Sequence, residues 1–390
     1  MENWKTVRLG DVCEILNGYA FKSDKYVDSG IRVIRITNVQ KGFIEDNSPA
    51  FYPITEKENL KDYELYENDL LISLTGNVGR VALLSKEMLP AALNQRVGCI
   101  RIRDKNLLIS YLFTFLNSDK FESDCIYSAR GIAQKNMSTE WLKNYLIPLP
   151  PIEVQIKIAN NLNTCAKIIK KHNKQLNNFD LLIKSRFIEM FGDNPIENGK
   201  WKVEKLGNLG LCKNGMNFSY EDNGFEINCL GVGDFKDNAV ISNCEKLPVI
   251  SLNEKPSEEY LLKDNDIVFV RSNGNKELVG RSVLVHPRVL TTFSGFCIRF
   301  RLSTDSINHL FLLQFLKMPN TRKNMAGRGA NIQNLNQQIL SNLDIPVPPI
   351  SLQNDFASFV QQIDKSKFAV QKSLEKAETL YKSLMQEYFG

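Results

Sequence analysis

Histidine is scarce in this sequence, and the motifs of common catalytic sites are missing. The three histidines are His172, His286 and His309, and none lies near a serine or cysteine in a nucleophile motif. There is also no H-E-x-x-H metal motif and no G-x-x-x-x-G-K-[ST] phosphate loop. A DNA methyltransferase that acts on the amino group of adenine needs an Asn/Asp-Pro-Pro-aromatic motif. The two Pro-Pro pairs of this sequence are instead followed by Ile152 and Ile350. These absences argue against an enzyme that acts alone.

Zinc-ligand patterns are absent as well. No two of the eight cysteines form a C-x-x-C pair, and none lies at zinc-ligand spacing from a histidine. We therefore expect free and buried thiols and no bound metal. The cysteines are Cys13, Cys99, Cys125, Cys165, Cys212, Cys229, Cys244 and Cys297.

Long apolar runs are also missing. No stretch of about 18 uninterrupted apolar residues occurs, and the first ten residues are polar and charged rather than basic and then apolar. We expect a cytoplasmic protein without a membrane partner.

The composition is that of an ordinary globular protein. Hydrophobic residues make up 43% and charged residues 24% of the 390 residues, a length that fits two globular units better than one. The net charge of +5 is divided as 0, +3, +2 and 0 over residues 1–150, 151–195, 196–348 and 349–390. Because local arrays of lysine and arginine can contact phosphates on a neutral surface, net charge neither supports nor excludes nucleic acid.

The most informative feature is an internal repeat at an offset of 197 to 198 residues. Trp4, Asn17-Gly18 and Asn68-Asp69 match Trp201, Asn214-Gly215 and Asn265-Asp266 at +197. At +198 the matches are Cys99-Ile100-Arg101 with Cys297-Ile298-Arg299, Arg103 with Arg301, Arg130-Gly131 with Arg328-Gly329, and Pro150-Pro151-Ile152 with Pro348-Pro349-Ile350. The segments between these anchors match poorly, which indicates one frame with two different surfaces.

Each copy ends in a predicted long helix. A 4-3 apolar spacing indicates a heptad seam, and prolines before Ile152 and Ile350 and glycines at Gly192 and Gly390 mark the ends. Neither helix can bury its seam alone, so we expect an antiparallel coiled coil. His172 and Lys367 also lie in the seam, where we interpret them as partly solvated. The predicted apolar seam residues are Leu162, Ile169, Leu176, Ile183, Met190, Val360, Ile363, Val370, Leu374 and Leu384.

The remaining parts predict a mixed α/β (α+β) fold, because short alternating runs are followed by helical patterns at 109–116 and 307–316. Two glycine-bearing loops recur in both copies, at 75–80 and 129–136 and at 272–276 and 327–334. They are rich in residue types that bind base edges and phosphates. Ordinary tight turns with solvated side chains remain an equal alternative for any one residue. The candidate DNA-binding residues are Asn77, Arg80, Arg130, Gln134, Lys135, Asn136, Asn273, Asn275, Lys276, Arg328, Asn331, Gln333 and Asn334.

Two diverged globular parts, each followed by a Pro-Pro-x-x-x-Gln helix, and the segment Arg186–Pro195 followed by Lys200-Trp201 resemble the specificity subunits of type I restriction-modification systems. The resemblance covers the whole chain. It implies two pseudo-symmetric target-recognition domains, at 1–150 and 197–348, separated by two conserved helices, at 151–193 and 349–390. It also implies that each domain binds one half of a split, asymmetric site on double-stranded DNA.

The resemblance further implies partners that carry the chemistry. Two methyltransferase subunits would dock along the helices and use S-adenosylmethionine, and restriction subunits would use ATP and magnesium; this chain would hold no cofactor. Two alternatives remain open. The chain could serve another restriction-methylation arrangement, or it could be a duplicated scaffold without DNA contact.

Overall fold

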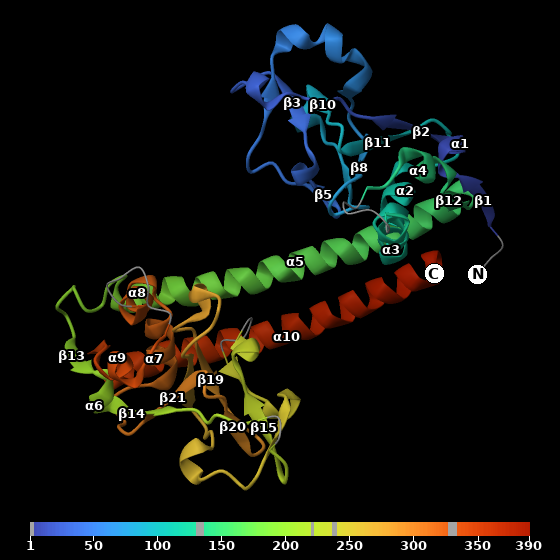
Figure 1. The fold of residues 1–390 in the computed structure, drawn as a ribbon. Helices are drawn as coiled ribbons and strands as arrows, with labels where there is room; N and C mark the ends of the chain where they lie inside the picture. The colour runs from blue at the N-terminus through green and yellow to red at the C-terminus, as the bar shows by residue number, and fades with distance from the viewer. Residues whose placement is uncertain (1–3, 130–135, 220–221, 236–239, 327–333) are drawn as a thin grey trace. The chain divides into compact units, whose positions relative to one another are not determined.

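The computed structural model describes residues 4–129, 136–219, 222–235, 240–326 and 334–390, with the backbone alone for Lys276 and Ala326. The chain divides into two compact units (Figure 1). Unit 1 contains Met1–Asn173 and Lys372–Gly390, and unit 2 contains Lys174–Gln371. Each unit therefore combines one globular domain with segments of both long helices.

Unit 1 contains two main sheets among its described residues. Their strand orders are β2-β11-β8-β9 and β6-β3-β10-β7, and β1 pairs with β12 and β4 with β5. Pairing is antiparallel except between β3 and β10. The bounds are β1 Lys5–Arg8, α1 Leu9–Val12, β2 Cys13–Asn17, β3 Ile31–Ile34, β4 Val39–Gln40, β5 Phe43–Ile44, β6 Phe51–Tyr52, β7 Glu64–Leu65, β8 Leu70–Ser73, β9 Val81–Leu83, β10 Ala91–Leu93, β11 Val97–Ile102, α2 Ile109–Leu116, α3 Asp119–Ser128, α4 Thr139–Asn144 and β12 Leu146–Leu149.

Unit 2 repeats this plan. Its sheets have the orders β14-β21-β18-β19-β16 and β17-β15-β20, and β13 pairs with β22. The bounds are β13 Lys202–Lys205, α6 Leu206–Leu209, β14 Gly210–Asn214, β15 Phe225–Leu230, β16 Val240–Ile241, β17 Val249–Leu252, β18 Asp266–Val270, β19 Ser282–Val285, β20 Thr291–Phe293, β21 Cys297–Leu302, α7 His309–Leu316, α8 Pro319–Ala326, α9 Gln337–Ser341 and β22 Asp344–Val347. The mixed α and β fold is confirmed.

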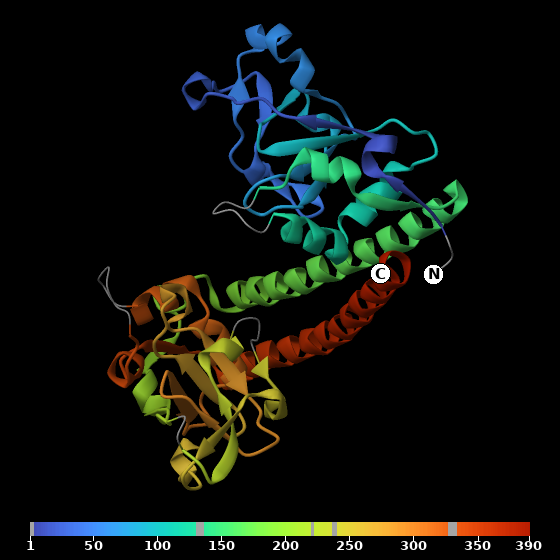
Figure 2. The same ribbon diagram turned by 45° about the vertical axis from the view of Figure 1, so that its right-hand side comes forward.

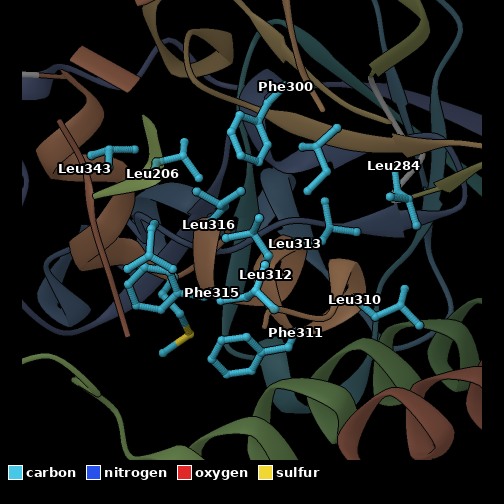
Figure 3. Packing of buried hydrophobic residues seen from close by; sticks show 14 of the residues in the cluster. Leu206, Leu284, Phe300, Leu310, Phe311, Leu312, Leu313, Phe315, Leu316 and Leu343 are labelled. Carbon is cyan, nitrogen blue, oxygen red and sulfur yellow. The ribbon is translucent and has the colours of Figure 1, made fainter. Parts of the chain in front are cut away.

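The core of unit 2 forms where α7 covers the sheet. Leu312 and Leu316 of α7 lie with Phe300 of β21 and Leu284 of β19 in one buried cluster (Figure 3). An apolar helix that packs on a largely apolar strand face is the ordinary two-layer solution for burying both surfaces. The corresponding cluster of unit 1 contains Leu112 of α2 with the strands β8 and β11.

Two long helices connect the parts of the chain, α5 (Ile152–Phe191) and α10 (Ile350–Phe389). The predicted starts and stops of both helices are confirmed. A buried glutamine secures each start: the Gln155 side chain accepts a hydrogen bond from the Leu108 N–H at 2.9 Å and donates to the Asn106 and Pro150 carbonyls, both at 2.8 Å. Gln353 makes the equivalent three bonds at the start of α10. The Pro-Pro-x-x-x-Gln motif thus fastens each helix to the domain that precedes it.

Within each unit, segments of α5 and α10 pack side by side in opposite directions (Figures 1 and 2). In unit 1, Asn161 Nδ2 donates to the Tyr388 hydroxyl at 3.2 Å, and His172 Nε2 lies 3.1 Å from Ser373 Oγ. In unit 2, Lys367 Nζ lies 2.6 Å from Asp180 Oδ1. The two polar seam positions, His172 and Lys367, therefore both contact the opposite helix.

The apolar seam residues all lie on the inward side of the helices. Leu162, Ile183, Val360 and Leu374 are buried, and Ile169, Leu176, Met190, Ile363, Val370 and Leu384 are half-buried. The heptad pattern missed three buried aromatic residues near the C-terminal ends of the helices, because there the inward positions recur every four residues and enter a domain core. These residues are Phe187, Phe191 and Phe389. A fourth buried aromatic residue, Phe356, lies seven residues before Ile363 and continues the predicted seam toward the start of α10.

The structure corrects the repeat register predicted for β11 and its counterpart β21. Arg101 bonds Asp69 and Arg301 bonds Asp266 through the same two guanidinium nitrogens, so Arg101 corresponds to Arg301 at an offset of 200. The prediction that Arg101 matches Arg299 was wrong by two residues. Side chains along a strand alternate between the two faces of the sheet with a period of two. A register shift of two residues therefore keeps the same pattern of buried and exposed residues, and the sequence pattern could not reveal the error.

Candidate nucleic-acid interface

Three segments of unit 1 meet at the end of β8. They are the loop at 75–80, the turn at 94–96 between β10 and β11, and residues 136–137 before α4. The Leu74 N–H donates to the Arg96 carbonyl at 3.0 Å, and the Met137 N–H donates to the Leu74 carbonyl at 2.8 Å. Thr75 and Asn136 form a β-bridge. The described end of the candidate loop at 129–136, Asn136, therefore lies next to the candidate loop at 75–80.

Unit 2 brings the equivalent segments together with the same bonds. The Arg271 N–H donates to the Phe296 carbonyl and the Leu335 N–H to the Arg271 carbonyl, both at 2.8 Å, and Ser272 bridges Asn334. A glycine with positive φ precedes the next strand in each unit, Gly79 at 86° before β9 and Gly280 at 78° before β19. At Gly79 a Cβ would lie 2.7 Å from the Cys125 Cβ, so this close approach of loop and helix requires glycine.

The described candidate residues differ in availability. Asn77, Asn136 and Asn334 are exposed. Arg80 is half-buried, and its guanidinium donates to Gln40 Oε1.

Asn273 and Asn275 each accept a backbone N–H, at 2.7 and 3.0 Å. This partly supports the alternative of a tight turn for those two residues. Arg130, Gln134, Lys135, Arg328, Asn331 and Gln333, and the Lys276 side chain, lie outside the described residues.

Sequence reasoning missed the turn at 94–96 and its counterpart at 294–296. Arg96 is exposed, and within the described ranges its guanidinium has no ion pair. Phe296 is 61% exposed. The run Asn94-Gln95-Arg96 contains only residue types that bind base edges, and this was the available signal.

The loop predicted at 272–276 in unit 2 ends before the structural equivalent of Arg80. Arg281 occupies that position, because the carbonyls of Arg80 and Arg281 accept equivalent bonds, from the Ser73 and Val270 N–H groups.

Neither unit holds a recognisable metal or thiol site in its described part. No group of three or more His, Cys, Asp or Glu residues is placed there to hold a metal ion. All eight cysteines are free, and burial raises the pKa of the Cys13 and Cys229 thiols to about 12, which keeps both protonated at neutral pH. Among the described helices, none has the length and apolar character needed to cross a bilayer.

One frame that occurs twice, with exposed asparagine amides at the equivalent positions Asn136 and Asn334 and different residues elsewhere on the loops, defines a duplicated two-domain protein. The family model for the type I restriction modification DNA specificity domain matches residues 1–178 and 198–378. The chain therefore belongs to the type I restriction-modification specificity family, whose members recognise a DNA site.

Known relatives agree over nearly the full length. The chain is 24% identical to the type I restriction enzyme StySPI specificity subunit of Salmonella potsdam, covering 99% of this chain and 87% of the relative. It is also 24% identical to the MjaVIII specificity subunit of Methanocaldococcus jannaschii, covering 98% and 91%.

Solved structures share the fold. The S subunit of a type I restriction-modification system from M. genitalium superposes with a TM-score of 0.62 at 15% identity, covering 100% of this chain and 96% of that one. A chain solved in work on complex assembly and conformational transition of the type I R-M system gives a TM-score of 0.56 at 17% identity, covering 100% and 98%.

Proposed function

We propose that this chain is the non-catalytic DNA-reading subunit of a type I restriction-modification complex and binds a bipartite, asymmetric site on double-stranded DNA. Each globular domain binds one half-site through a loop cluster. This cluster is formed by residues 75–80, 94–96 and 136–137 in unit 1 and by residues 272–276, 294–296 and 334–335 in unit 2. The observation that carries the proposal is that the two clusters have the same backbone bonds but different side chains, Asn-Gln-Arg at 94–96 and Ser-Gly-Phe at 294–296. A shared frame with different contact residues binds two related but unequal sequences.

The helices dock two methyltransferase subunits, and restriction subunits join through them. Leu182 of α5 and Leu380 of α10 occupy equivalent repeat positions, 198 residues apart, and are 46% and 52% exposed. An apolar side chain kept at the surface in both copies suits the same partner bound twice. S-adenosylmethionine, ATP and magnesium bind to those partners, which carry the chemistry.

The test exchanges residues 1–150 for the corresponding domain of a relative with a different known target. The complex with its methyltransferase subunits is then expressed, and methylated adenines in the host genome are mapped by single-molecule sequencing. We expect one half of the methylated site to change and the other half to stay. If both halves remained unchanged, the model of two independent readers would fail.

A gel-shift titration separates the alternatives. We expect the complex of this chain with methyltransferase to bind the mapped duplex more tightly than a scrambled duplex. No affinity for any duplex would instead support a scaffold without DNA contact. The identity of the neighbouring subunits decides between a type I complex and another restriction-methylation arrangement.

A further inference from the structure

One position in the loop cluster carries opposite chemistry in the two domains. Arg96 and Phe296 are structurally equivalent, since their carbonyls accept the N–H bonds of Leu74 and Arg271. The following turn bond is also the same: the Val97 N–H donates to the Asn94 carbonyl and the Cys297 N–H to the Ser294 carbonyl, both at 2.8 Å. The backbone therefore presents a guanidinium in unit 1 where it presents a phenyl ring in unit 2.

The Phe296 ring is exposed although its neighbours are not. It is 61% accessible, while Gly295 and Cys297 are buried. The ring lines a hollow of about 470 Å³ together with Val232, Ser272, Asn273, Gly274 and Asn334. An apolar ring therefore lies beside the exposed amide of Asn334 in the candidate interface of unit 2.

This combination suits an A·T base pair. In the major groove an asparagine amide can pair with adenine, and an apolar side chain can contact the C5-methyl group of thymine. A phenyl ring has no hydrogen-bond donor, so it cannot bind the O6 and N7 acceptors of guanine. The exposed Arg96 of unit 1 has the opposite property, because a guanidinium can donate two bonds to O6 and N7 of guanine.

We propose that this turn position sets base preference in both half-sites: Arg96 selects a G·C pair in the half-site of domain 1, and Phe296 selects an A·T pair through the thymine methyl group in the half-site of domain 2. The inference rests on the proposed function and assigns specificity to one pair of residues. It is distinct from the domain-exchange result, which does not depend on any single residue.

For Phe296, the experiment removes one methyl group from the DNA. The full chain in complex with its methyltransferase subunits is titrated with duplexes in which each thymine of the domain 2 half-site is replaced, one at a time, by deoxyuridine. Burial of one methyl group is worth a factor of about four in Kd. We expect a loss of about fourfold at one position for the wild type and no loss at that position for Phe296→Ala.

The controls use matched variants. Phe296→Leu keeps an apolar contact and should remain sensitive to deoxyuridine. Phe43→Ala removes a similarly exposed phenylalanine, 57% accessible, from the other domain and should leave the sensitivity unchanged. If the wild type tolerated deoxyuridine at every position of this half-site, or if Phe296→Ala kept the full sensitivity, the assignment of Phe296 would be overturned.

For Arg96, 7-deazaguanine removes N7 from single guanines of the domain 1 half-site. We expect a loss of about tenfold at one position for the wild type and no loss there for Arg96→Ala. Arg103→Ala, which removes an exposed arginine paired with Glu14 at 2.6 Å, is the control and should behave as the wild type. Equal sensitivity of Arg96→Ala and the wild type would overturn this half of the proposal.

The outcomes separate this inference from the proposed function. If substitutions at Arg96 and Phe296 leave binding and the methylated site unchanged while exchange of residues 1–150 still alters one half-site, the inference fails and the proposed function stands. If the exchange alters neither half-site, both fail.

Discussion

At the scale of single residues, each of the duplicated Asn-Asp pairs forms a surface turn that buries its aspartate. Asn68 and Asn265 adopt positive φ values of 70° and 66°, a conformation that asparagine tolerates better than most residues. The following aspartates are buried. Asp69 accepts two bonds from Arg101, at 2.8 and 2.7 Å, and one from the Tyr66 N–H at 2.8 Å. These bonds fix a loop to the centre of the sheet.

Removal of this aspartate is expected to be costly. Asp69→Ala leaves the Arg101 guanidinium without its carboxylate partner, and the expected loss is roughly 3–5 kcal/mol of unfolding free energy. Arg103→Ala is the control: this residue lies just past the end of β11 in a mostly exposed ion pair, and its loss should cost less than about 1 kcal/mol. Urea unfolding followed by circular dichroism measures both. Similar values for the two variants would refute a special role for the buried pair.

A second prediction concerns the buried glutamine at the start of α5. Gln155→Ala leaves the Leu108 N–H and two carbonyls without partners, and each buried polar group left unpaired costs about 1–3 kcal/mol. We expect a total loss of roughly 2–4 kcal/mol, since water can satisfy part of the set. Gln361→Ala, at an exposed position of α10, should change stability by less than about 0.5 kcal/mol. The same unfolding measurement compares them.

At the scale of elements, the parts with local periodicity were predictable and the parts built from distant contacts were not. The prolines, the heptad spacing and the glycines were sufficient to predict where α5 and α10 begin and end, because these signals act within a few turns of the helix. The β11 register depends on pairing with strands far away in the chain. The meeting of Thr75 with Asn136 likewise follows from sheet order, which a single sequence does not contain. The candidate loops were therefore found, but their third member, with Arg96 and Phe296, was not.

The helices yield a prediction about target spacing. One heptad inserted at equivalent seam positions in both α5 and α10 lengthens each helix by about 10 Å and keeps the seam in register. If helix length sets the separation of the two readers, the preferred gap between half-sites grows by about three base pairs, at 3.4 Å per pair. Adenine methylation mapped across duplexes of varied gap length tests this. An unchanged gap preference would refute the idea of a rigid spacer.

At the scale of the whole molecule, each domain is completed by the far end of the other copy's helix. Phe389 of α10 packs edge-on against Tyr111 and Phe115 of unit 1, with ring centroids 5.9 and 5.2 Å away. Phe191 of α5 packs against Phe311 of unit 2 at 4.7 Å. Because Phe191 and Phe389 are equivalent in the repeat, the two copies exchange the same structural part.

Reciprocal substitutions test this exchange. Truncation of a buried phenylalanine to alanine costs roughly 3–5 kcal/mol. Phe389→Ala should therefore speed amide hydrogen exchange in α2 of unit 1 and leave α7 of unit 2 unchanged, whereas Phe191→Ala should do the opposite. Each variant is the control for the other. Equal acceleration in both helices for either variant would show that the units are not stabilised separately.

The division of the chain also sets an order of assembly during translation. Unit 2 is one uninterrupted stretch, Lys174–Gln371, whereas unit 1 combines Met1–Asn173 with Lys372–Gly390. A ribosome makes the first domain early but supplies Phe389, which closes its core, only after all of unit 2. We therefore expect the part synthesised first to complete its core last, and its apolar surface around Tyr111 and Phe115 to stay open until the end of α10 is made.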